Sequence, residues 1–334
     1  MDLKLLQKLS NAVSLGHIKE ARDIVKAELS KYAEVKDFGQ IGLLAEINKG
    51  KEKTFLLDAH IDEVGFIVTK VLGDGFLRVT NVGGCDARIL PATPVTVHGT
   101  KEVSAVFAST PPHLSGGDRK VQGLDEIVLD TGDPDIEDLV KAGDLVSYKT
   151  EFCSLNGNRV TGKSLDDRAG VFCLLEVAKR IFDKDLAYNV IFSIAEGEEL
   201  GLRGATTAAY KISPDEAIAV DVSFGDGPSV SMDTCGVLGK GAMLGISPVL
   251  DRGVTERLKK IAKDKNIPLQ YEVMGNKTST DADVISVSRS GVKTGLLSIP
   301  LRNMHTPAEV IDTADLKAVI SLLENYALGG KEKC

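Results

Sequence analysis

The sequence has no tryptophan, and aromatic residues make up only 5% of its 334 residues. This scarcity argues against a groove that holds sugars by stacking them on aromatic rings. Cysteine is also scarce, with five residues and no Cys-x-x-Cys pair. An odd number of unclustered cysteines predicts reduced thiols and gives no support to a cysteine-rich zinc site. We therefore expect a protein of a reducing compartment, the cytoplasm.

Long hydrophobic runs are missing as well. No stretch of about 18 apolar residues occurs, which excludes a membrane-spanning helix. The formal net charge of -8 argues against a nucleic-acid partner, because phosphates would repel the protein. Residues 1–35 carry charges throughout an apolar pattern of helical period. That pattern predicts an amphipathic helix and not a signal peptide.

The pattern of apolar and turn-forming residues changes twice along the chain. Residues 65–159 consist of short apolar runs separated by Gly, Pro and Asp, which predicts a compact inserted all-β unit, either a small barrel or a sandwich. Strand-like runs at 54–59, 189–195, 216–222 and 295–300 alternate with helix-like runs elsewhere. Such alternation is typical of α/β proteins with helices on both faces of a sheet. We predict an α/β/α domain with a mixed sheet, formed by residues 1–64 and 160–334.

Polar residues follow the apolar strands directly, and another polar group begins the helix-like run near residue 165. The residues concerned are His60, Asp62, Asp166, Glu198, Glu199, Asp221 and His305. In open α/β sheets, ligands bind outside the carboxyl ends of the strands. The sequence therefore predicts that these five separate segments converge on one crevice.

The residue types at this crevice predict a metal site. Histidine and carboxylate ligands without thiolate suit zinc, cobalt or manganese at a catalytic centre. Neighbouring side chains diverge in an extended segment, so Glu198 and Glu199 can serve as a base and as a ligand. His60 and Asp62, two residues apart, share one face of a strand, which predicts that Asp62 supports the His60 ring.

Each of these residues also has an ordinary structural interpretation. His60 alone could be a cap or turn residue, and Asp167 and Arg168 could belong to a charged first helical turn. Glu196 could be a solvated strand end, and Asp281 could cap a helix. His98 is interpreted as a surface residue of the β unit. The joint pattern favours a site more strongly than any single member of it.

Five motifs in a fixed order carry a family resemblance. LDAHIDEVGF, GKSLDDRAG, GEELGLRGA, AIAVDV and RNMHTPAEV resemble the tetrahedral (TET-type) aminopeptidases, metallopeptidase family forty-two of clan MH. That family includes glutamyl and deblocking aminopeptidases, and some members are labelled endoglucanases. The resemblance covers essentially the whole chain. It implies a catalytic α/β domain, an inserted β-barrel domain, and a homo-oligomer, commonly a dodecamer, with its active sites facing inward.

The resemblance also implies a role for each site residue. His60 and Asp221 would bind a first divalent ion, Glu199 and His305 a second, and Asp166 would bridge the two. Glu198 would be the general base, and Asp62 would support the first ligand. The implied substrates are peptides cut at their N-termini. The sequence departs from the family at GEE and TSTDA, where many relatives have QEE and GGTDA. The preferred N-terminal residue is therefore not carried over.

Three other functions remain open at this point. A deacylase or carboxypeptidase could use the same two-metal scaffold. An endo-β-glucanase needs two carboxyl groups facing each other across the bond, roughly 5 to 9.5 Å apart. The adjacent Glu198 and Glu199 do not supply that arrangement by themselves. A metal-dependent shell protein without activity is disfavoured by the intact set of ligands and base.

Overall fold

The computed structural model describes residues 1–334 except 48–49, 112, 115–121, 125, 229 and 330–334. Its centre is a mixed eight-stranded sheet. In spatial order the strands are β17 (Leu269–Val273), β16 (Ala242–Ile246), β18 (Lys293–Leu301), β15 (Glu216–Phe224), β5 (Thr54–His60), β14 (Asn189–Ala195), β4 (Gly42–Ile47) and β3 (Glu34–Asp37). The three central pairings, β18–β15, β15–β5 and β5–β14, are parallel. The carboxyl ends of these strands therefore meet at one edge of the sheet.

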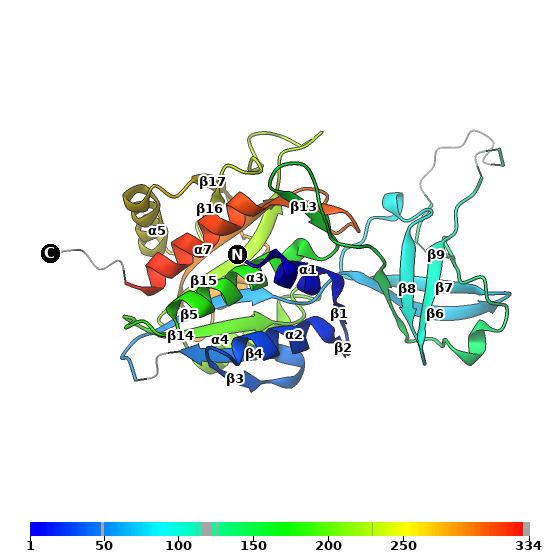
Figure 1. The fold of residues 1–334 in the computed structure, drawn as a ribbon, viewed down its shortest axis with the longest axis horizontal. Helices are drawn as coiled ribbons and strands as arrows, with labels where there is room; N and C mark the ends of the chain where they lie inside the picture. The colour runs from blue at the N-terminus through cyan, green and yellow to red at the C-terminus, as the bar shows by residue number, and fades with distance from the viewer. Residues whose placement is uncertain (48–49, 112, 115–121, 125, 229, 330–334) are drawn as a thin grey trace.

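Helices cover both faces of this sheet (Figure 1). The helices are α1 (Leu3–Asn11), α2 (Glu20–Leu29), α3 (Leu165–Ile181), α4 (Arg203–Ile212), α5 (Arg252–Lys265), α6 (Ala282–Ser286) and α7 (Thr313–Ala327). Phe55 and Leu57 of β5 pack into a core shared with α1, α2, α3, α5 and α7. Leu56, on the opposite face, packs with apolar residues of α4 and α6. The predicted α/β/α architecture is confirmed.

The N-terminal segment is not the single amphipathic helix that its period predicts. Helix α1 begins after Asp2, whose side chain accepts a hydrogen bond from the Lys4 N–H, and it ends at Asn11. A hairpin of β1 (Ser14–Leu15) and β2 (Ile18–Lys19) follows, and α2 begins only at Glu20. The hairpin turns at Gly16, whose φ of +54° suits glycine. The helical period therefore runs through a break that its apolar residues do not reveal.

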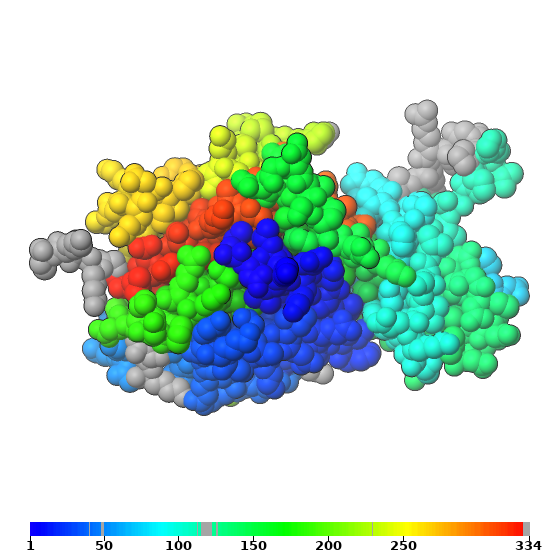
Figure 2. Space-filling view, viewed as in Figure 1, coloured from blue at the N-terminus to red at the C-terminus, as the bar shows by residue number. Residues whose placement is uncertain are grey.

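A closed six-stranded barrel lies to one side of the α/β layers (Figure 1). Its strands, in order around the barrel, are β10 (Leu129–Asp130), β7 (Phe76–Val82), β6 (Gly65–Gly73), β11 (Leu145–Tyr148), β8 (Pro94–His98) and β9 (Glu102–Phe107). Phe66 contacts Phe107 and Tyr148 edge-on in a core separate from that of the sheet. Figure 2 shows the barrel as a lobe beside the larger α/β part. The domain boundaries at 64/65 and 159/160 stay a prediction.

Short elements connect the two parts. A three-stranded sheet combines β12 (Cys153–Ser154), β13 (Arg159–Gly162) and β19 (Glu309–Asp312), none of which the sequence patterns predicted. Three 3-10 turns complete the described structure: η1 (Gly39–Ile41), η2 (Ala87–Ile89) and η3 (Ile136–Asp138). No helix of the described residues is long and apolar enough to cross a membrane. The four described cysteines are free, and Cys334 lies outside the described residues.

A buried ionic network joins the start of α3 to the N-terminal segment. Arg168 is fully buried and donates to the carbonyls of Ile61, Leu9 and Ala12 at 2.7, 2.5 and 3.0 Å. Its guanidinium also lies 3.4 Å from Glu63, which pairs with Lys163 at 2.5 Å. Arg168 thus belongs to the charged first turn of α3, as its ordinary interpretation held, and it also ties this turn to the N-terminal segment. Its charge is compensated inside the protein.

We predict that Arg168→Met destabilises the protein by about 3–5 kcal/mol, because it leaves buried acceptors without a partner. The measurement is chemical unfolding followed by circular dichroism. Arg180→Met is the matched control on the same helix, since the Arg180 side chain is 35% exposed and pairs with Glu324 at the surface. The control should cost less than about 1 kcal/mol. Equal effects of the two changes would contradict the prediction.

Candidate metal centre

The end of β5 places the first two candidate residues. His60 is the last residue of the strand and is buried, with Nε2 3.1 Å from Asp166 Oδ1. Asp62 follows with Oδ1 3.5 Å from His60 Nδ1. This nitrogen has no hydrogen-bond partner among the described residues. The carboxylate of Asp62 therefore lies beside the ring, on the side away from Asp166.

Asp166 lies between the two histidines. Its Oδ1 faces His60, and its Oδ2 lies 3.2 Å from His305 Nε2. The same His305 nitrogen lies 3.1 Å from Glu199 Oε1. His60 and His305, 245 positions apart in the sequence, thus contact the same carboxylate. The peptide bond that follows Asp166 is cis. The two oxygens of Asp166 each face a different histidine, as a bridging ligand requires.

The remaining two candidates complete the cluster. Asp221, in β15, has Oδ1 3.9 Å from His60 Nε2. Glu198 has Oε2 4.0 Å from the same nitrogen. All seven residues that the sequence singled out therefore come together at the carboxyl ends of the parallel strands. The convergence arises because β5, β14 and β15 are adjacent and parallel.

These side chains offer ligand sets for a divalent cation. Three groups have ligand atoms within 4.8 Å of one another: His60 with Asp166 and Asp221, Asp166 with Glu199 and His305, and His60 with Glu198 and Glu199. Asp166 belongs to the first two groups. The donors are imidazole nitrogens and carboxylate oxygens, which fit zinc, cobalt or manganese and exclude a thiolate-dependent metal.

Electrostatics at the cluster favour a bound cation. Burial raises the pKa of Glu198 to about 7, and the charges of Glu199 and Asp166 add to the shift while His60 opposes it. Burial also raises the pKa of Asp221 well above its usual range, again with help from Asp166 and Glu198. Asp166 differs, because hydrogen bonds from His305 and His60 overcome burial and lower its pKa. A cation would relieve the repulsion among these carboxylates.

Two buried carboxylates fix the backbone around the cluster. Asp62 accepts hydrogen bonds from the N–H groups of Glu198 and Glu199, at 3.1 and 3.3 Å. Glu309 accepts hydrogen bonds from the N–H groups of Asp166 at 3.1 Å and His305 at 2.8 Å. Glu309 is 2% exposed, and the sequence reasoning gave it no role. The available signal was a single acidic residue directly before the apolar pair Val310-Ile311, in a motif already noted for His305.

Two ordinary interpretations of single residues, those of Glu196 and His98, are wrong. Glu196 is not a solvated strand end, because it is 4% exposed and pairs with Arg22 at 2.8 Å and with Lys19. Asp167 lies in the first turn of α3, as interpreted, and is fully buried. Asp281 is the N-cap residue of α6, but its buried side chain makes no capping hydrogen bond. The His98 side chain is 9% exposed and lies 2.9 Å from Ser147 Oγ. Strand and helix patterns do not show which polar residues turn inward.

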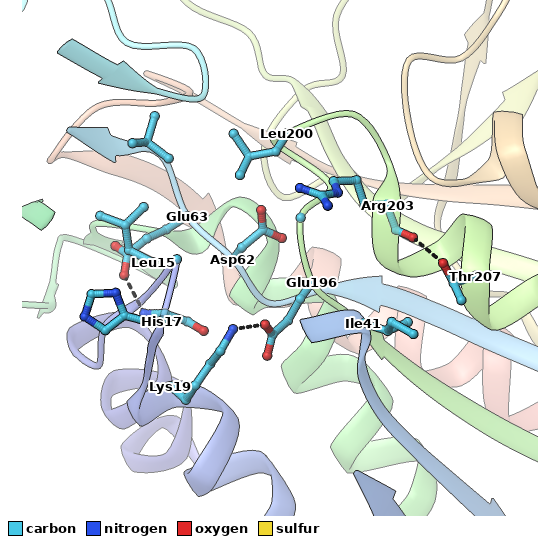
Figure 3. Close-up of a pocket in the computed structure, with 14 residues that line it drawn as sticks. Leu15, His17, Lys19, Ile41, Asp62, Glu63, Glu196, Leu200, Arg203 and Thr207 are labelled. Atoms are coloured by element: carbon cyan, nitrogen blue, oxygen red, sulfur yellow. Dashed lines mark hydrogen bonds and ion pairs between the residues drawn. The ribbon is translucent and has the colours of Figure 1, made fainter. Parts of the chain in front are cut away.

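The cluster opens into a large cavity. The cavity has a volume of about 940 Å³ and is lined by the metal-site residues together with β17, α6 and the loop between them. A second cavity of about 420 Å³ is lined by Asp62 and by residues of the N-terminal hairpin, the end of β14 and the start of α4. Figure 3 shows Lys19 and Glu196 paired on its wall, with Arg203 opposite. Of these two cavities, only the larger has both His60 and His305 among its described lining residues.

An α/β/α sheet with a two-histidine carboxylate cluster at its carboxyl edge defines a metal-dependent hydrolase type of site. Comparisons with known proteins narrow this class. The family model for M42 glutamyl aminopeptidases matches residues 42–322. The chain is 30% identical to the lysyl aminopeptidase of Pyrococcus furiosus, over 96% of this chain and 95% of the relative. The chain belongs to the M42 glutamyl aminopeptidase family, and the predicted enzyme class, a peptidase hydrolase, is confirmed.

Solved structures agree with this assignment. The aminopeptidase APDkam598 from Desulfurococcus kamchatkensis superposes with a TM-score of 0.91 at 30% identity, covering 98% of this chain and 94% of that one. The Pyrococcus horikoshii TET1 peptidase, which can assemble into a tetrahedron or a large octahedral shell, has a TM-score of 0.87 at 32% identity. The coverage is 98% of this chain and 99% of that one. The predicted fold, with its inserted barrel, is that of the TET peptidases.

We predict that zinc, cobalt or manganese raises the unfolding temperature of chelator-treated protein. A cation that binds only the folded state stabilises it by about 2.7 kcal/mol at 100 times its Kd. Asp166→Asn should abolish most of the shift, because Asp166 faces both histidines. Asp264→Asn, an exposed carboxylate on α5, is the control and should keep the shift. No shift of the native protein with any of the three cations would rule out the metal site.

Proposed function

We propose that this protein is an aminopeptidase that holds two divalent cations. His60, Asp166 and Asp221 would hold the first, and Asp166, Glu199 and His305 the second. The supporting observation is the position of Asp166, whose two oxygens face separate histidines at 3.1 and 3.2 Å. Bound in this way, a pair of zinc, cobalt or manganese ions polarises a carbonyl and lowers the pKa of a water molecule.

Glu198 is the proposed general base. Its carboxylate lines the large cavity beside His60, and burial raises its pKa into the range useful for proton transfer near neutral pH. It takes a proton from the attacking water as the oxygen bonds to the carbonyl carbon of the first peptide bond. It then gives that proton to the departing amine nitrogen as the C–N bond breaks. The hydrogen bonds from the N–H groups of Glu198 and Glu199 to Asp62 hold this segment in place.

Removal of N-terminal residues is the proposed mode of action. The substrate's free α-amino group would lie against a carboxylate or a cation at the closed end of the cavity. A deacylase or carboxypeptidase on this scaffold would need a different end group, so acetylated substrates separate the alternatives. An endo-β-glucanase is disfavoured, because Phe224 is the single aromatic residue among the described lining residues.

We predict that metal-reloaded protein releases p-nitroaniline from free aminoacyl-p-nitroanilides and not from their N-acetylated forms. Glu198→Gln should lower kcat by about 10²- to 10⁴-fold, because it removes the proton carrier. Metal analysis should show nearly normal metal content in this variant. Glu199→Gln is the matched comparison and should lose metal as well as activity. Near-normal turnover by Glu198→Gln would contradict the assigned base.

We also propose that the chain assembles into a dodecamer in the cytoplasm. The assembly of the Pyrococcus horikoshii relative into a tetrahedron supports this proposal. The proposed barrel domain, residues 65–159, would then help to build the shell and control substrate access, while residues 1–64 and 160–334 form the catalytic domain. Light scattering of metal-loaded protein should show a dodecamer. A particle that stays monomeric at all concentrations would contradict it.

A further inference from the structure

The large cavity contains a carboxylate that the proposed reaction does not use. Glu272 of β17 lines the cavity and is half-buried. Ser298 Oγ donates to its Oε2 at 2.8 Å, and Ser223 Oγ donates to its Oε1. No lysine, arginine or histidine of the described residues forms an ion pair with Glu272. A fixed negative charge thus faces the cavity without a positive partner.

Strand register places this carboxylate next to the metal centre. Ser298 on β18 is the direct parallel-strand partner of Asp221 on β15. Neighbouring strands lie about 4.8 Å apart, so the hydroxyl that holds Glu272 is one strand from a proposed ligand. The side chain of Glu272 crosses β16, because it accepts hydrogen bonds from Ser298 on β18 and from Ser223 on β15. Its carboxylate therefore lies beside the strand that carries Asp221.

Apolar residues line part of the cavity that contains Glu272. Val222, Phe224, Val249, Met274 and Val287 line the same cavity. Such a surface suits the aliphatic stem of a long side chain, while the carboxylate suits a positive group at its tip. A short acidic side chain would be repelled by Glu272. A purely apolar side chain would leave the carboxylate without a partner.

Two other charged residues outside the metal cluster line this cavity, and neither forms an ion pair with Glu272. Asp283 already accepts hydrogen bonds from Thr278 and from the N–H of Ser279, so it is locally satisfied. Lys277 is exposed and belongs to the loop after β17. It forms no ion pair with Glu272. The charges that line this cavity outside the metal cluster are therefore two carboxylates, Glu272 and Asp283, and one exposed ammonium group, Lys277.

From this geometry we infer that Glu272 selects substrates whose N-terminal residue is lysine or arginine. This inference rests on the proposed aminopeptidase function and specifies its substrate class. Glu272 would bind the side chain of the residue that is removed, while the metal centre acts on that residue's carbonyl. Ser223 and Ser298 position the carboxylate. The enzyme's preference would then come from an interaction with the substrate's positive charge.

The test compares lysyl- and norleucyl-p-nitroanilide, which differ in the terminal ammonium group. The native enzyme should have a higher kcat/KM for the lysyl substrate, and Glu272→Gln should lower the lysyl-to-norleucyl ratio by about 10- to 100-fold. The ratio is measured on one metal-loaded preparation, so metal content cancels. Glu272→Lys should move the preference toward glutamyl-p-nitroanilide, which a purely structural role would not do.

Lys277→Gln is the matched control, because it removes a charge from the same cavity without touching Glu272. It should not lower the lysyl-to-norleucyl ratio. An active native enzyme with no lysyl preference, or an unchanged ratio in Glu272→Gln, would overturn the inference and leave the aminopeptidase intact. Failure of the native, metal-loaded enzyme to hydrolyse any free aminoacyl compound would instead overturn the proposed function, and the inference with it.

Discussion

The crowding of buried carboxylates around His60 is the constraint on which this structure depends. Asp166, Glu199 and Asp221 meet at one edge of the sheet, where burial and the charges of Asp166 and Glu198 raise the pKa of Asp221. Histidines compensate only part of this charge. The fold therefore places the cluster where a divalent cation can supply the rest. A packed α/β core on both faces of the sheet holds the repelling groups together.

Backbone contacts determine the geometry of the cluster as much as the ligands do. Asp62 holds the Glu198–Glu199 segment by two N–H groups, and Glu309 holds Asp166 and His305 in the same manner. A carboxylate that binds backbone N–H groups fixes the direction of the neighbouring side chains without becoming a ligand itself. Asp62 and Glu309 each accept hydrogen bonds from two backbone N–H groups of site residues. The proposed base and the proposed ligands are thus oriented by the same kind of contact.

Local period and strand order were sufficient to predict the layers, an all-β insert and the convergence of seven side chains, and the family resemblance added that the insert is a barrel. The sequence was insufficient where tertiary packing decides. The break between α1 and α2 is hidden, because both helices and the hairpin place apolar residues at compatible spacing. The positions of Glu309 and Glu272 depend on strand register, which is that of β19 against β13 for Glu309 and that of β17 against β16 for Glu272. Their sequence neighbours do not show which strand they will face.

The pairing of β13 with β19 also determines when the site can exist. Residues 159–162 of the chain hydrogen-bond to residues 309–312, and His305 lies just before this second segment. During synthesis His60 is made long before His305, and β19, the strand that follows His305, is made later still. A nascent chain can form β5 and the barrel while its carboxylate cluster remains incomplete. Capture of a cation by both histidines therefore has to follow the synthesis of β19 and its pairing with β13.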